Sequence, residues 1–141
     1  MPEVILIMSI IAMFAGSFIA IFQDNLKHML AYSSVAQIGY ITLGFSLISV
    51  SGLTGSVVHI FNHAMMKGAL FMAVAGVVLT YQGTTIRDFA GLGRSAPWTM
   101  TAFAIAALSL IGVPLTAGFQ SKLQLGFALF DQGLWWAVGL V

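Results

Sequence analysis

The segment HIFNHAMMKGALF (residues 59–71) places three basic side chains, His59, His63 and Lys67, four residues apart in an apolar stretch. Residues i and i+4 lie on one face of a helix, so the three side chains are predicted to form one stripe. With the helix predicted over 53–81, Lys67 falls near its middle. If this helix crosses a bilayer, a central lysine costs roughly 2.5–3.5 kcal/mol, so it should face protein or water instead of lipid.

Charge is scarce along the whole chain. Of its 141 residues, 60% are hydrophobic and only 6% are charged, and the mean hydropathy is +1.02. Soluble domains carry about 25% charged residues, so we predict an integral, multi-pass membrane protein in contact with lipid, a single domain over 1–141. The absence of cysteine excludes a disulfide framework and a thiolate metal site. A net charge of +1 gives no reason to expect nucleic acid, and no cofactor is expected.

The apolar stretches predict the fold class, an all-α membrane protein with four transmembrane helices and a truncated fifth. The fourth stretch is too long for one unbroken span, and Pro114, flanked by Gly112 and Gly118, should break it. Such a break is tolerated where the freed backbone groups are buried in protein or face water. The spans are predicted over 4–22, 24–48, 53–81 and 98–130, and the fifth begins at LWWAVGLV and stops at Val141.

The basic loop residues predict an orientation. Lys27, Arg87 and Arg94 fall in loops on one side of the predicted spans, and the opposite loops carry no lysine or arginine. The positive-inside rule places the basic side in the cytoplasm and the N-terminus outside.

The acids of the chain offer Lys67 no obvious partner. All four, Glu3, Asp24, Asp88 and Asp131, are predicted near helix ends. This leaves either a partner from another chain or a lysine that exchanges its proton. Because intramembrane ionisable groups mark functional sites by default, a proton-relay role is predicted for Lys67.

The histidines allow two interpretations. His59 and His63 could be hydrogen-bonded packing residues, or they could carry protons, since an imidazole changes charge near neutral pH. Their alignment with Lys67 favours the relay. A His-x-x-x-His pair can bind zinc, but HIFNH lacks the glutamate of the zinc-protease motif, so no metal site is predicted.

Two more lysines are candidates for the relay. Lys122 follows the break at Pro114, and transporters use the exposed ends of broken helices for ion sites at mid-membrane. Its alternative role is a lysine that extends from a helix end toward the interface. Lys27 is either the cytoplasmic entry point of the relay or an interfacial lysine paired with Asp24, three residues before it.

The segment AYSSVAQIGY (residues 31–40) supplies small residues for close helix packing. Its Ser33, Ser34 and Gln37 can hydrogen-bond across helices or hold water. We expect packing to be their main role.

Four motifs, in this order, carry a family resemblance: DNLKHMLAYSSVAQIGY, HIFNHAMMKGALF, DFAGLGRSAPWTM and SLIGVPLTAGFQSK. They resemble the proton-conducting antiporter-like membrane subunits, which include large subunits of Mrp-type sodium/proton antiporters and three subunits of respiratory complex I. The match covers nearly the whole chain, and the motifs are most similar to those of the D-type large subunit of the Mrp antiporters.

The resemblance implies two five-helix repeats of inverted topology, each with one broken helix. This chain resembles the second repeat alone, so it is expected to be a fragment, a split gene product or an incomplete reading frame. The resemblance assigns Lys122 to the broken helix, on a half-channel to the outer face. It assigns Lys27, His59, His63 and Lys67 to a relay along the centre of the membrane.

The function that the resemblance implies is proton translocation by hopping along buried lysine, histidine and water. The chain would be part of a multisubunit sodium/proton antiporter in a prokaryotic cell membrane, with other membrane subunits, protons and Na⁺ as partners. One alternative is a complex I subunit driven by quinone reduction. Another is a structural membrane subunit whose lysines pair with acids of its neighbours. No nucleophile–base pair or phosphate loop is present, so a transporter subunit is expected and not an enzyme.

Overall fold

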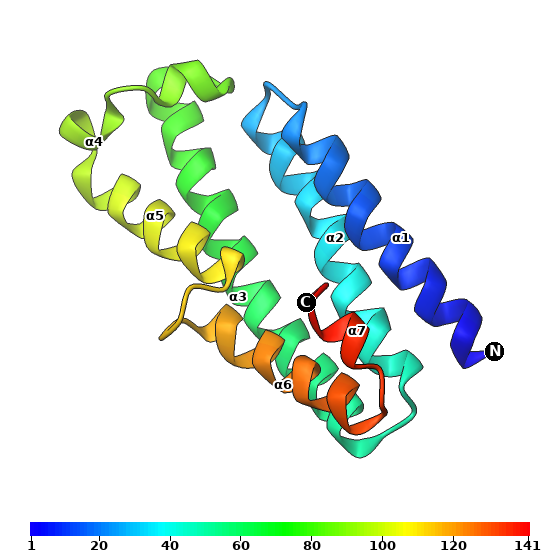
Figure 1. Ribbon diagram of the computed structural model, residues 1–141. Helices are drawn as coiled ribbons and strands as arrows, with labels where there is room; N and C mark the ends of the chain where they lie inside the picture. Colours follow the sequence, from blue (N-terminus) through cyan, green and yellow to red (C-terminus); the bar gives the residue numbers. More distant parts are fainter.

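The computed structural model describes residues 1–141 and consists of helices and their connections (Figure 1). The first three long helices agree with the predicted spans to within a few residues, and the third, with 32 residues, is about 48 Å long. In chain order the elements are α1 (Pro2–Ile21), α2 (Leu26–Ser46), α3 (Val50–Tyr81), η1 (Ile86–Phe89), α4 (Leu92–Ser95), α5 (Pro97–Ile111), α6 (Ala117–Asp131) and α7 (Trp135–Val138).

The helices begin at residues that suit a first turn. The side chain of Asn25 accepts hydrogen bonds from two backbone N–H groups of α2, and Ser49 does the same for one N–H of α3. Pro2 and Pro97 occupy the first turns of α1 and α5, where a missing N–H costs nothing. These local signals determine where the helices begin.

Two helices, α1 and α3, are long and apolar enough to cross a membrane by length and composition. With 21 residues α2 is long enough, but its polar residues make it less apolar than those two. The 15-residue helices α5 and α6 are each about 22 Å long, shorter than a full span. The four complete spans and the partial fifth therefore stay a prediction.

The long fourth stretch is divided, as the sequence predicted for a break near Pro114. Helix α5 ends at Gly112, whose φ of 91° lies in the left-handed region, where glycine is favoured. Leu115 has a φ of 77°, and α6 begins two residues later. The two half-helices follow one another beside α3, with the turn between them projecting outward (Figure 1).

The helices pack as a chain of neighbours: α1 on α2, α2 on α3, and α3 on both α5 and α6 (Figure 1). Two apolar clusters hold them together. One joins α2, α3 and α5 near one end of the molecule, through Leu26, Leu30, Leu70, Val74 and Ala106. The other joins α1, α2, α6 and α7 near the opposite end, through Met13, Leu43, Leu47, Ala128, Leu129 and Ala137.

A short backbone bridge joins two connections at one end of the molecule. The N–H of Leu26 donates to the carbonyl of Thr84 at 2.9 Å, and the N–H of Ile86 donates to the carbonyl of Asp24 at 3.0 Å. The α1–α2 and α3–α5 connections therefore lie side by side, which gathers the basic residues Lys27, Arg87 and Arg94 at this end.

Candidate functional site

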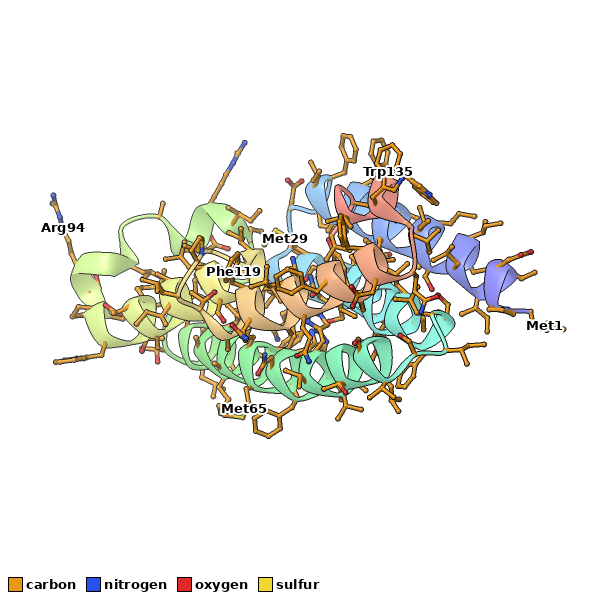
Figure 2. The ribbon with its side chains drawn as sticks, turned by 60° about the horizontal axis from the view of Figure 1, so that its bottom comes forward. Met1, Met29, Met65, Arg94, Phe119 and Trp135 are labelled. Atoms are coloured by element: carbon orange, nitrogen blue, oxygen red, sulfur yellow. The ribbon has the colours of Figure 1, made fainter.

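Several polar side chains are buried on the facing sides of α2, α3 and α6. His59 and Ser121 are fully buried, Lys67 is 5% exposed and Gln37 is 7% exposed. Helix α6 lies beside the first part of α3, and α5 lies beside the rest (Figure 1 and Figure 2). Only 6% of the residues are charged, yet several polar side chains, one of them a lysine, lie in the interior.

His59 is at the centre of the site. Its Nδ1 lies 2.8 Å from Oγ of Ser121 on α6, and its Nε2 lies 2.8 Å from Oε1 of Gln37 on α2. The Ser121 hydroxyl is also 3.1 Å from the Gly118 carbonyl, to which it can donate. Both nitrogens of the imidazole are thus used, and the ring connects three helices.

His63 lies one turn further along α3 and continues the stripe. Its ring is stacked on that of His59, with centroids 6.4 Å apart and an interplanar angle of 23°. Its Nδ1 is buried without a hydrogen-bond partner. This nitrogen is therefore free to form a hydrogen bond. No group of three or more His, Cys, Asp or Glu side chains is placed to hold a metal ion.

Lys67 is held by neutral oxygens alone. Its Nζ donates to the carbonyl of Leu30 at 2.5 Å and to the hydroxyl of Ser33, both on α2. No carboxylate is among these partners, as the positions of the acids in the sequence suggested. A buried ammonium without a counter-ion is unusual.

Lys122 lies at the break, against the end of α5. Its Nζ is 3.4 Å from the Ile111 carbonyl and 4.6 Å from the ring centroid of Tyr40. The Tyr40 ring in turn packs edge-on against His59, with centroids 5.9 Å apart. The side chain also lines an apolar cavity of about 460 Å³ between α5, α6 and α7. The Tyr40 ring therefore contacts both Lys122 and His59.

Polar groups attach the start of α6 to both α5 and α3 at the break. The Gly118 N–H donates to Oγ of Ser109 at 3.3 Å, and the side-chain amide of Asn62 donates to the Ala117 carbonyl at 2.8 Å. A side chain at Gly118 would run into the Ser109 carbonyl. Gly118 is thus needed for close approach, while Pro114 lies exposed in the turn.

Lys27 differs from the other candidates. It is exposed in the first turn of α2, at the basic end of the molecule. Its role as an entry point for protons remains a prediction.

Four contributors were not identified from the sequence: Tyr40, Asn62, Ser109 and Ser121. Gln37, expected mainly to pack, contacts His59 directly. Weak signals existed, because Asn62 lies inside HIFNH and Ser121 directly precedes Lys122.

The whole chain, residues 1–141, matches the family model described as NADH:quinone oxidoreductase/Mrp antiporter, transmembrane. NADH-quinone oxidoreductase subunit N of Desulforudis audaxviator is 46% identical over 120 residues, which cover 85% of this chain and 24% of that protein.

Two solved structures are similar in fold. The Mrp complex from Dietzia sp. DQ12-45-1b contains a chain with a TM-score of 0.93 and 32% identity, covering 98% of this chain and 26% of that one. The membrane-bound sulfane sulfur reductase, an archaeal respiratory membrane complex, contains a chain with a TM-score of 0.92 and 37% identity, covering 99% of this chain and 28% of that one. The chain thus spans about a quarter of the length of the proteins it matches.

Proposed function

Because the chain belongs to the NADH:quinone oxidoreductase/Mrp antiporter transmembrane family, we propose that its buried lysines and histidines carry protons across the membrane. The relay would run through Lys67, His63, His59 and Lys122, with Lys27 at its basic end. The observation that supports this proposal best is the environment of Lys67, a buried amine held by neutral oxygens and aligned with two histidines.

The chemistry of these contacts suits a group that gains and loses a proton. A carbonyl oxygen accepts a hydrogen bond from an ammonium and from a neutral amine, so Lys67 keeps this partner in both states. A carboxylate would instead stabilise the charged form and retain the proton. His63 follows on the same face of α3. Its buried Nδ1 has no hydrogen-bond partner and could bond to a water molecule or to Lys67.

Two kinds of driving force are compatible with the same relay. Similar proteins occur in an Mrp complex and among NADH-quinone oxidoreductase subunits. The first predicts exchange of protons for Na⁺ with other membrane subunits, and the second predicts pumping driven by redox subunits. Purification of the native complex separates them, because only the second would bring NADH- or quinone-reactive partners with the chain.

Replacement of Lys67 tests the relay itself. Lys67→Arg keeps a positive charge and hydrogen-bond donors, but arginine stays protonated in proteins. We expect proton transport into vesicles containing the complex to fall at least roughly tenfold, since a relay group that cannot release its proton blocks the path. Arg94→Lys, an exposed change at the basic end, is the control and should transport normally.

The structural alternative makes the opposite prediction for the same variant. If Lys67 only pairs with an acid of a neighbouring subunit, arginine should preserve that pair and transport should continue. Normal transport by Lys67→Arg, with subunit assembly unchanged on a native gel, would therefore contradict the proposal.

A further inference from the structure

We infer that Ser121 is a positioning residue whose hydroxyl switches between two acceptors as His59 gains and loses a proton. The inference rests on the proposed proton relay and adds a member to it. It also explains why a serine lies fully buried between a histidine and a backbone carbonyl.

The distances give the hydroxyl two acceptors and one proton. Oγ of Ser121 lies 2.8 Å from Nδ1 of His59 and 3.1 Å from the carbonyl oxygen of Gly118. A serine hydroxyl donates one hydrogen bond and can accept others. Ser121 and His59 are both 0% exposed, so these atoms have each other as partners, and an unmade bond is costly.

An amide oxygen can only accept, so the contact with Oε1 of Gln37 assigns the proton of neutral His59 to Nε2. Nδ1 then has a free lone pair, which accepts the hydroxyl proton of Ser121. Every polar atom of the ring is satisfied in this state.

In the charged state the imidazole has bound one more proton, as an N–H bond at Nδ1. This N–H donates to Oγ of Ser121, and the hydroxyl turns its own proton to the Gly118 carbonyl. The imidazole gains one proton and one positive charge, and Ser121 keeps its proton. Loss of the proton reverses the rotation of the hydroxyl.

The other groups around His59 cannot perform this switch. On α2, Gln37 presents an oxygen that only accepts, and Tyr40 presents the edge of its ring. On α3, His63 stacks on the ring without bonding to it. On α6, Lys122 lies over the Tyr40 ring and has no hydrogen bond to His59. Ser121 is the neighbour that can both donate to Nδ1 and accept from it.

The test compares Ser121→Ala with Ser56→Ala in vesicles that contain the complete complex. Ser56 is a matched control, because it is also 0% exposed and its hydroxyl also joins two helices, donating to the Ile41 carbonyl at 2.8 Å. It is bonded to no titratable side chain. We expect Ser56→Ala to transport protons at close to the normal rate.

We expect Ser121→Ala to transport roughly tenfold more slowly, since it leaves a buried ring nitrogen without a partner. The loss should be larger at the acidic end of the pH range, because the charged imidazole suffers more from a missing acceptor than the neutral ring. Assembly, followed on a native gel, should be unchanged.

Two results would overturn the inference: Ser121→Ala transports normally, or it slows transport by a factor that is uniform in pH and equal to that of Ser56→Ala. Lys67→Arg in the same assay distinguishes failure of the Ser121 switch from failure of the proposed relay. If Lys67→Arg is inactive while Ser121→Ala is normal, only the switch is wrong. If Lys67→Arg is itself normal, the relay is wrong.

Discussion

Replacing Gly118 with alanine should force the half-helices α5 and α6 apart. The added Cβ would lie 2.9 Å from the Ser109 carbonyl carbon and 3.2 Å from Sδ of Met66. The added Cβ would also overlap the Ser109 carbonyl oxygen itself, so α6 must retreat from α5 by roughly an ångström or more. Crowding of this kind costs about 1–3 kcal/mol of stability.

The same displacement reaches the buried site, because Ser121 lies one turn after Gly118 on α6. The crowding against Met66 on α3 directs part of this retreat away from α3. A component of roughly 0.5 Å in that direction would lengthen the 2.8 Å contact between Ser121 and His59 beyond the usual limit of about 3.2 Å for such a bond. Proton transport should therefore fall several-fold, together with a lower thermal unfolding midpoint of the complex.

The matched control is Gly126→Ala on the same helix, where the added Cβ would make an ordinary 3.8 Å contact with Val138. Vesicle transport and thermal unfolding of the detergent-solubilised complex are measured for both variants, and Gly126→Ala should leave both unchanged. If Gly118→Ala matches the unmodified complex in rate and stability, the close-approach reasoning is refuted.

Two further predictions concern single side chains. Tyr40→Leu should slow proton transport several-fold, because it removes the aromatic face that lies 4.6 Å from the Lys122 ammonium. Tyr40→Phe keeps this face and should retain most of the transport. The vesicle assay compares the two variants. In the loop at the basic end, hydrogen bonds from the Thr85 side chain and backbone hold the pKa of Asp88 below its ordinary value of 3.8. The stabilisation by this cap is therefore complete above pH 3.8 and is lost as the pH falls through the lower folded-state pKa. Hydrogen exchange over 86–89, relative to an unstructured reference, should show this loss only in strong acid, whereas Asp88→Ala should remove the protection at neutral pH.

The helices could be predicted from the sequence because their signals are local. Apolar stretches, polar connections and first-turn prolines lie next to the residues that they organise. The break near Pro114 was predictable for the same reason, since proline and glycine act on their own backbone. The stripe of His59 and Lys67 followed from helical spacing alone, and both residues are buried.

The contacts across helices could not be predicted in the same way. Spacing within α3 determines which of its side chains share a face, but it does not determine the register of α2 and α6 against that face. The choice of Leu30 and Ser33 as partners of Lys67 depends on this register. Ser121 was missed for the same reason, because a serine within an apolar helix usually bonds to its own backbone.

The bridge between the α1–α2 and α3–α5 connections has a consequence for biosynthesis. The N–H of Leu26 finds its partner at Thr84, about sixty residues later in the chain. A ribosome adds about 5–20 residues per second, so the α1–α2 hairpin waits several seconds before that partner exists. During this interval water and lipid headgroups must satisfy the exposed backbone groups of the hairpin. If α1, α2 and α3 span the membrane as predicted, the bridge closes only after α3 has returned to the same side, so it links the sidedness of the three helices.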